Sequence, residues 1–221
     1  MVRAIEKSPK IFSVSPKMIQ LYHKDLMDDA GDMYSLPGWA YQRGVGQSSK
    51  GYTKPCRVFS ACAGAAIYRR EVFEEIGGFD EAHFAYLEDI DVGYRARIFG
   101  YENVYWPDAV VYHVGSGTSG SKYNSFKVRL AARNGVYLNY KNMPVLQLAV
   151  NFLPLAAGIL VKYLFFKKMG FGEDYVDGVK EGIRTAGKTK KVKFRADRLG
   201  RYLRIEGELI FGMGVYVWEF L

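Results

Sequence analysis

The chain has 221 residues and a mass of 25.1 kDa, enough for one ordinary domain with an appendage or for two small domains. Hydrophobic residues make up 49% and charged residues 24%, which excludes global disorder, collagen and coiled coil. Cys56 and Cys62 cannot form a disulfide framework, and their spacing fits neither a zinc ribbon nor a CxxC redox pair. The net charge of +8 equals the surplus between Lys162 and Arg204, so one stretch makes the protein basic.

Residues 1–143 alternate short helical and extended patterns, as an α/β layer does. The segment 22–54 is rich in Gly, Ser and aromatics, and its turn signals predict a loop. Pro107 separates two strand patterns, and Gly77 and Gly100 follow two helical patterns and predict where they end. In chain order, we expect the end of a helix at 1–7, a strand at 11–14, an extended run of small residues at 58–68, helices at 69–76 and 88–99, strands at 103–106 and 109–113, and a helix from about 123 to 140.

Residues 144–221 form the predicted second part, a helical tail that opens with the uncharged segment 145–161. This segment is slightly short for a membrane span, and it holds Pro154 near its middle. The lysines and aromatics that follow, at 162–168, favour a helix that lies in the membrane interface. A buried core helix and a true span are the alternatives.

The run 188–204 holds eight Lys and Arg residues and one acid, Asp197. Next to an anionic lipid leaflet, each such positive charge contributes about 1 kcal/mol to binding. A solvated helix face is the alternative interpretation. Nucleic-acid binding is not expected, because the sequence has neither a known reading module nor interleaved stacking aromatics.

The densest acidic motif is Glu88-Asp89-Ile90-Asp91, at the predicted start of a helix. The positive end of the helix dipole lowers carboxylate pKa values there, so at least one acid is expected to be ionised at neutral pH. An ionised carboxylate at the edge of a pocket accepts a proton from an attacking hydroxyl, which predicts a general base. Helix capping combined with a salt bridge is the alternative. Asp91 and Arg95 stand four residues apart, so we expect them to pair and to have a structural role.

Two patterns bear on metal binding. Asp89 and Asp91 match a DxD pattern, but two acids two positions apart on a helix point in different directions and make a weak metal clamp. His113 ends a predicted strand and runs into the polar loop 115–120, where it is suited to ligate a divalent metal or to contact a phosphate. A structural histidine is the alternative.

Four sequence blocks follow one another along residues 1–143: Cys62-Ala63-Gly64-Ala65-Ala66-Ile67-Tyr68-Arg69-Arg70, Gly77-Gly78-Phe79-Asp80, Tyr86-Leu87-Glu88-Asp89-Ile90-Asp91-Val92-Gly93-Tyr94-Arg95, and Val111-Tyr112-His113. In order and spacing they resemble the acceptor half of an inverting family 2 glycosyltransferase, in its rhamnosyltransferase-like subgroup. The resemblance implies a partial α/β domain of the GT-A type at 1–143, followed by a basic, amphipathic tail at 144–221 that lies on a membrane.

The resemblance also implies roles for individual residues. Asp89 is implied to be the general base that deprotonates the acceptor hydroxyl, with Glu88 beside it as the alternative. Arg95 is implied to brace Asp91, and His113 to complete a site for a divalent metal, Mg²⁺ or Mn²⁺, and a diphosphate. Sugar-binding residues are implied in a small-residue strand and in an aromatic loop: Gly64, Ala65, Ala66, Trp39 and Tyr41.

Members of the family begin with strand-helix repeats that bind the nucleotide and end in a DxD metal motif, and this chain starts just beyond that point. We therefore expect either a truncated or split product, inactive as it stands, or a donor half supplied by a separate polypeptide. The implied reaction moves a sugar from a nucleotide-sugar donor to a hydroxyl of a saccharide or lipid-linked acceptor, with inversion. It would serve cell-surface polysaccharide or glycolipid synthesis at the cytoplasmic face of the membrane. The alternative is a non-catalytic membrane-surface scaffold that retains the acceptor half.

Overall fold

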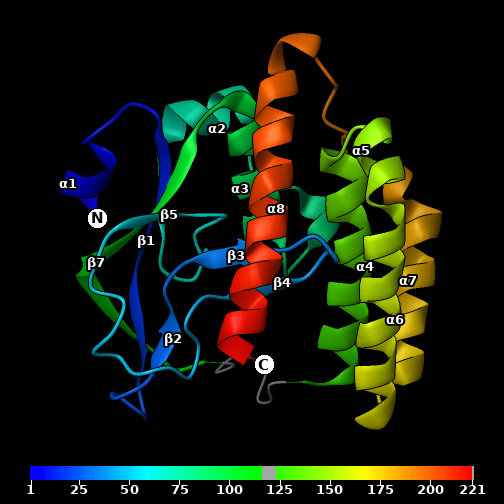
Figure 1. Ribbon diagram of the computed structural model, residues 1–221, viewed down its shortest axis with the longest axis horizontal. Helices are drawn as coiled ribbons and strands as arrows, with labels where there is room; N and C mark the ends of the chain where they lie inside the picture. The colour runs from blue at the N-terminus through cyan, green and yellow to red at the C-terminus, as the bar shows by residue number, and fades with distance from the viewer. Residues whose placement is uncertain (116–122, 221) are drawn as a thin grey trace.

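The computed structural model describes residues 1–115 and 123–220. It has a mixed α/β architecture in which the main sheet lies on one side, a group of helices lies on the other, and helix α8 crosses in front (Figure 1). The predicted α/β class is confirmed, whereas the GT-A type and the division at residue 143 stay predictions.

The main sheet is built on two long parallel strands, β1 (Ile11–Gln20) and β7 (Glu102–His113). The strand order is β2-β1-β7-β5, and β6 also pairs with β1. The short strands β2 (Met27–Asp29), β5 (Cys56–Val58) and β6 (Ile67–Tyr68) all run antiparallel to their partners. The first nine residues of β1 are buried, as expected for a central strand that is covered on both faces.

The two strands predicted at 103–106 and 109–113 form a single strand, β7, so the prediction of a break is wrong. The pairing register with β1 shifts between Pro16 and Lys17, opposite the segment that holds Pro107. Because Pro107 therefore lies in a bulge, the sheet does not need a hydrogen bond from its nitrogen.

The segment 22–54, predicted to be a loop, contains three short strands. One is β2; the other two, β3 (Asp32–Tyr34) and β4 (Ala40–Gln42), form a separate antiparallel pair. The strand predicted at 11–14 continues to Gln20 because β2 and β7 both pair with its second half. These pairings join residues far apart in sequence, which local turn signals do not report.

Three short helices in the first part agree closely with the sequence. They are α1 (Val2–Ile5), α2 (Arg70–Ile76) and α3 (Glu88–Phe99). α2 ends at Gly77 and α3 at Gly100, where φ is +83° and +95°. Residues with a side chain rarely adopt such angles, so the two glycine stop signals are confirmed.

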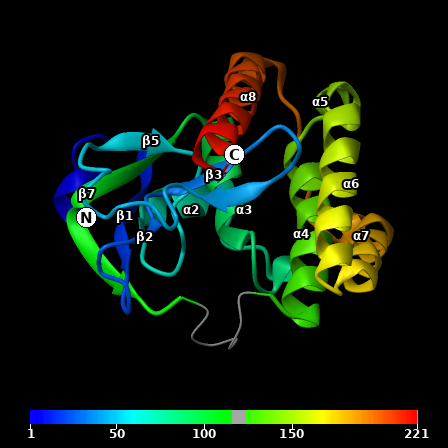
Figure 2. The ribbon, with the colours of Figure 1, turned by 60° about the horizontal axis from the view of Figure 1, so that its bottom comes forward.

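Helices α4 (Ser125–Asn142), α6 (Phe152–Lys168) and α7 (Gly172–Thr185) pack side by side away from the sheet (Figure 2). α4 corresponds to the helix predicted from about 123 to 140. The Asn124 side chain caps its first turn by accepting a hydrogen bond from the backbone N–H of Lys127 at 2.9 Å.

The uncharged segment 145–161 is divided between two helices. α5 (Val145–Val150) is followed by Asn151, and α6 starts at the next residue. The buried Asn151 side chain donates a hydrogen bond to Glu206 at 2.9 Å, which gives the break a polar partner. Within the described residues, no helix combines the length and the apolar composition that a membrane crossing needs.

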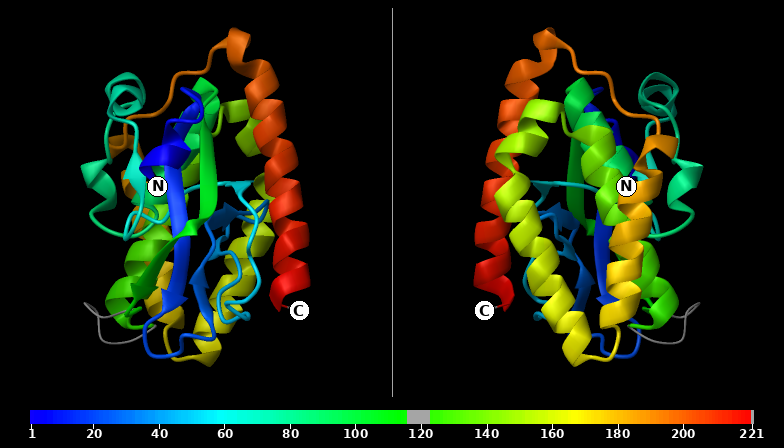
Figure 3. Two further views of the ribbon diagram at one scale, coloured as in Figure 1. Left: turned by 90° about the vertical axis from the view of Figure 1, so that its left-hand side faces the viewer. Right: turned by 90° about the vertical axis from the view of Figure 1, so that its right-hand side faces the viewer.

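Helix α8 (Leu199–Phe220) lies across the front of the molecule in Figure 1, beside the β3–β4 pair, and Figure 3 shows it along one edge. Its inward face belongs to the largest hydrophobic core cluster, through Tyr202, Ile205 and Leu209. Gly212 lets the helix approach β3, because a Cβ atom there would lie 2.4 Å from the carbonyl oxygen of Tyr34. Two 3-10 turns, at Ala186–Lys188 and Ala196–Arg198, precede α8, so the basic run 188–204 is not one continuous helix.

Candidate active site

Glu88 and Asp89 open helix α3, and the chain reaches them through a strained turn. Phe84, Tyr86 and Leu87 have positive φ values of 61°, 69° and 66°. Such angles are uncommon for residues other than glycine and persist where the surrounding structure holds them. The strain directly precedes the two acids, and strain of this kind clusters at the functional sites of proteins.

Side chains of α4 hold the turn in place. The amide nitrogen of the buried Asn134 contacts three carbonyl oxygens, at 2.9, 2.7 and 2.8 Å: those of His83, Ala85 and Tyr86. The neighbouring Arg133 donates hydrogen bonds to the carbonyl oxygens of Ala82 and His83, at 3.1 and 3.0 Å. The position of the acids at the start of α3 therefore depends on α4.

The Asp89 carboxylate is oriented by two backbone amides. Its Oδ1 accepts a hydrogen bond from the N–H of Ile90 at 2.8 Å, and its Oδ2 accepts one from the N–H of Ala63 at 3.2 Å. The helix dipole was expected to lower the pKa of this acid, but burial raises the pKa of Asp89 above its ordinary value, and the two hydrogen bonds only partly offset the rise. A carboxylate that is held in one orientation and has a raised pKa is suited to accept a proton near neutral pH.

Glu88 lies beside Asp89 as the second acid. Burial raises its pKa, and the charge of Asp89 raises it further. Its Oε2 atom is buried and has no hydrogen-bond partner among the described residues. Glu88 is therefore less firmly oriented than Asp89.

Asp91 belongs to a buried ionic network, and the predicted ion pair with Arg95 is present. Arg95 contacts Asp91 Oδ2 at 2.8 Å, and the ammonium of Lys141 contacts the same oxygen at 2.8 Å. Arg95 also donates to the carbonyl oxygens of the Gly77-Gly78 segment at 2.5 and 2.7 Å. Burial alone would raise the pKa of Asp91, but the charges of Arg95 and Lys141 hold it below its ordinary value. Asp91 thus supports the fold, as predicted.

The segment Gly64-Ala65-Ala66 is not a strand, so this part of the prediction is wrong. The backbone N–H of Ala65 donates to the carbonyl oxygen of Cys62 at 3.2 Å and closes a turn. The chain turns here because the N–H of Ala63 binds the Asp89 carboxylate and not a neighbouring strand. A sugar-binding role for the segment stays a prediction.

Trp39 and Tyr41 anchor the β3–β4 pair between α6 and α8. The indole N–H of Trp39 donates to the carbonyl oxygen of Gly158 at 3.1 Å. The hydroxyl of Tyr41 donates to the carbonyl oxygen of Gly212 at 2.5 Å. Both rings also pack edge-on against Tyr216. These contacts account for the two aromatic residues through packing, and their role in sugar stacking stays a prediction.

His113 lies at the end of β7 and faces β2. Its Nδ1 atom is 2.8 Å from Oδ2 of Asp28. A carboxylate on one ring nitrogen is the usual partner of a metal-ligating histidine, and it leaves Nε2 as the ligating atom, so His113 fits a metal or phosphate role. Of the polar loop 115–120, residues 116–120 lie outside the described residues.

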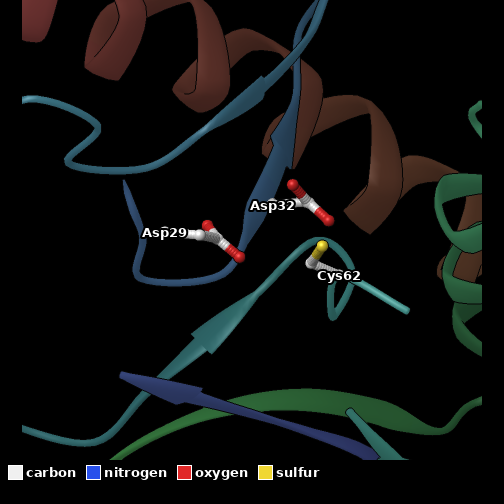
Figure 4. A group of neighbouring side chains, drawn as sticks. All are labelled: Asp29, Asp32 and Cys62. Carbon is white, nitrogen blue, oxygen red and sulfur yellow. The ribbon is translucent and has the colours of Figure 1, made fainter. Parts of the chain in front are cut away.

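A group of three side chains near Asp89 is not among the residues predicted from the sequence. Asp29, Asp32 and Cys62 point toward one another from β2, β3 and the segment after β5 (Figure 4). Their ligand atoms all lie within 4.8 Å of one another. The only sequence signal is the acidic spacing at 28–32, inside the segment predicted to be a loop.

No protein-family model matches the chain. Over 54 residues the chain is 43% identical to the N-acetylglucosaminyl-diphospho-decaprenol L-rhamnosyltransferase of Mycobacterium tuberculosis strain CDC 1551 / Oshkosh, and the same figures hold for that of strain ATCC 25618 / H37Rv. The matched segment covers 24% of this chain and 18% of each relative. The local match supports a glycosyltransferase-like relationship, which confirms the coarse part of the resemblance read from the sequence.

Proposed function

We propose that the chain is the acceptor-side part of an inverting glycosyltransferase and that Asp89 is its general base. The proposal rests on the Asp89 carboxylate, which is oriented by the N–H groups of Ala63 and Ile90 and has a pKa raised by burial. The local similarity to a rhamnosyltransferase supports the same reaction class. Glu88 is the alternative base, because it lies next to Asp89 in the same site.

In the proposed step, the acceptor hydroxyl gives its proton to Asp89 while its oxygen forms a bond to the anomeric carbon of the donor sugar. The nucleoside diphosphate leaves from the opposite side with the electron pair of the broken bond, which inverts the anomeric configuration. When bound, Mg²⁺ or Mn²⁺ offsets the charge on the leaving diphosphate. His113 would serve as one ligand through Nε2, since Asp28 occupies its Nδ1.

The names of the two relatives suggest which substrates to test first. Those proteins are named for L-rhamnosyl transfer to an N-acetylglucosaminyl-diphospho-decaprenol. We therefore take a nucleotide sugar as the donor and a saccharide on a diphospho-lipid as the acceptor. A donor half outside residues 1–221, on the same or a separate polypeptide, would bind the nucleotide.

Two measurements test this function. The chain is titrated with a short-chain N-acetylglucosaminyl-diphospho-lipid by calorimetry, and sugar transfer is assayed, after reconstitution with the donor half, with UDP, GDP and dTDP sugars in the presence of Mn²⁺. We expect saturable acceptor binding by the wild type and by Asp89→Asn, and a turnover lower by about 10²–10⁴-fold in Asp89→Asn. Asp177→Asn makes the same chemical change at an exposed site on α7 and should behave as wild type. Absence of both acceptor binding and transfer, or full turnover by Asp89→Asn, would contradict the proposal.

A membrane surface is the second proposed partner, and α8 provides the first evidence for it. The helix carries a second apolar stripe on the face opposite its buried residues, with Trp218 90% exposed. Exposed apolar stripes of this size are unusual on a soluble surface. The exposed stripe consists of Leu203, Ile210, Phe211, Val217 and Trp218.

Helix α6 also carries exposed apolar residues, and α6 and α8 lie on either side of the β3–β4 pair (Figure 1). Its exposed apolar residues include Leu153, Leu160, Val161, Leu164 and Phe165. Exposed cations lie at the end of α6 and near the start of α8: Lys167, Lys168, Arg201 and Arg204. Apolar side chains bordered by positive charge suit the interface of an anionic leaflet, which makes the cytoplasmic face of the cell membrane the proposed location.

This surface also favours the second candidate function, a membrane-bound scaffold without catalysis. A scaffold would keep its lipid binding and would show no acceptor-dependent effect when Asp89 is replaced. The Asp89→Asn comparison above therefore separates the two functions.

A further inference from the structure

Asp29, Asp32 and Cys62 converge on one point although they come from three separate segments. Asp29 ends β2, Asp32 begins β3, and Cys62 follows β5 (Figure 4). The two carboxylates and the sulfur offer one ligand atom each, and these atoms all lie within 4.8 Å of one another. Donors bound to one tetrahedral Zn²⁺ ion lie about 3.3–3.7 Å apart, so the three ligand atoms have to approach one another by at most about 1.5 Å, which side-chain rotation can supply.

Three carboxylate oxygens of Asp29 and Asp32 are buried and lack a hydrogen-bond partner among the described residues. Asp29 is 0% exposed, and neither of its carboxylate oxygens has a hydrogen-bond partner among the described residues. Asp32 is 7% exposed, and its Oδ2 atom also lacks a partner there. Buried polar groups in folded proteins are nearly always paired, and an unpaired buried carboxylate is strongly unfavourable. Both carboxyl groups therefore need a proton or a cation.

The electrostatic surroundings of the pair are acidic. Asp28, Glu88 and Asp89 all act on Asp32 as negative charges, in addition to Asp29 itself. Arg43 is a positive charge that acts on Asp29, but it also stacks over the rings of Tyr52 and Tyr105 and lies outside the group of three. A bound divalent cation would offset this concentration of negative charge.

We propose that Asp29, Asp32 and Cys62 bind a divalent metal ion of intermediate softness, for which Zn²⁺ is the typical example. Two carboxylates and a thiolate form a donor set that such ions accept, whereas Mg²⁺ and Ca²⁺ prefer oxygen alone. Three protein donors leave at least one coordination position for water or a substrate hydroxyl. The site differs in donor chemistry from the diphosphate-bound Mg²⁺ or Mn²⁺ proposed at His113, and it does not depend on the proposed transfer reaction.

The thiolate allows a direct test with Co²⁺, which has the coordination preferences of Zn²⁺ and a visible spectrum. Chelator-treated full-length protein is titrated with Co²⁺, and absorbance is recorded in the ultraviolet and visible ranges. We expect saturation at one equivalent, a thiolate-to-cobalt charge-transfer band, and displacement of Co²⁺ by Zn²⁺. Cys62→Ser should lose the band, and Asp32→Asn should weaken binding by at least about tenfold.

Cys56→Ser is the matched control, because Cys56 is the other free cysteine, is also half-buried, and lies outside the group. It should keep both the band and the affinity. Circular dichroism establishes that each variant is folded, and Asp32→Asn serves as the test where Cys62→Ser is unstable. Absence of saturable Co²⁺ and Zn²⁺ binding by the folded wild type would overturn the proposal and leave the carboxyls protonated. Binding that survives both Cys62→Ser and Asp32→Asn would overturn it as well.

Discussion

The side-chain amide nitrogen of Asn134 lies 2.8 Å from the carbonyl oxygen of Tyr86, two residues before the first acid of the candidate site. Tyr86 has a φ of +69°, so this contact stabilises a backbone conformation that the residue rarely adopts. Helix α4 thereby contributes to the site although none of its residues was predicted to do so. The relationship connects the helical group with the acids at the start of α3.

We expect Asn134→Ala to destabilise the protein by about 1–3 kcal/mol, because it leaves buried carbonyl oxygens without a donor. Asn134→Asp has nearly the same shape but replaces the donor with an acceptor, so it should destabilise the protein at least as much. Urea denaturation measures both changes. If either variant lies within about 0.5 kcal/mol of wild type, Asn134 does not hold the turn.

Asp91→Asn should be among the most destabilising single changes in the chain. The replacement leaves Arg95 and Lys141 buried without their shared carboxylate, and breaking a buried ion pair in this way costs about 3–5 kcal/mol. The urea midpoint of Asp91→Asn is compared with that of Asp177→Asn, the same change at an exposed site. Equal midpoints would show that the network contributes nothing to stability.

The Asp91 network also predicts sensitivity to strong acid. Because the pKa of Asp91 is below 3.8 in the folded protein, its stabilising contribution is complete above that pH and is lost as the pH falls through the folded-state pKa. Wild-type stability should therefore decrease below about pH 4, and Asp91→Asn should lack this phase. If the stability of the two proteins decreases equally as the pH falls below about 4, this assignment is contradicted.

His83 predicts a separate loss of stability at mildly acidic pH. Burial lowers its pKa below 6.5, so the unfolded chain takes up the proton first. The contribution of His83 is complete above pH 6.5 and is lost as the pH falls below that value. His83→Phe keeps a ring against Tyr137 and should remove this phase from urea denaturation between about pH 8 and 5. His23→Phe changes an exposed histidine and should retain the phase.

Sequence patterns predicted the features that depend on neighbouring residues. The bounds of α3 follow from the acids at 88–91 and from the left-handed conformation of Gly100, and both are local signals. The ion pair of Asp91 with Arg95 follows from helical spacing alone. The order of the acidic and glycine blocks likewise indicated a glycosyltransferase-like relationship, which the local match supports.

The remaining features depend on contacts between distant segments. Asp29 and Asp32 reach Cys62 only after β2, β3 and β5 have assembled, and no spacing in the sequence reports that approach. Pro107 indicated a strand break because the compensating bulge depends on the pairing of β7 with β1. The packing of Trp39 was not predicted, because the carbonyl oxygen that accepts its indole N–H, that of Gly158, lies 119 residues away.

The α6–α8 surface predicts binding to anionic liposomes that weakens with salt. Three exposed lysines, Lys188, Lys190 and Lys193, lie in the segment that leads to α8. At about 1 kcal/mol each, replacing all three with Gln should weaken binding roughly 100-fold. Lys191 is kept in this variant because its ammonium donates to the carbonyl oxygen of Met143 at 3.2 Å, so its loss would disturb the fold. Sedimentation with vesicles at low and high salt measures the effect.

Apolar contact should contribute to the same binding and should resist salt, because burial of hydrophobic surface is not screened by ions. Trp218→Ser removes the most exposed large side chain of the α8 stripe and should reduce the binding that persists at high salt. Ile183→Ser is the matched control, since Ile183 is 69% exposed on α7, away from this surface. Equal weakening by Ile183→Ser and Trp218→Ser would contradict membrane binding through this surface. So would a wild type that does not bind anionic vesicles at low salt.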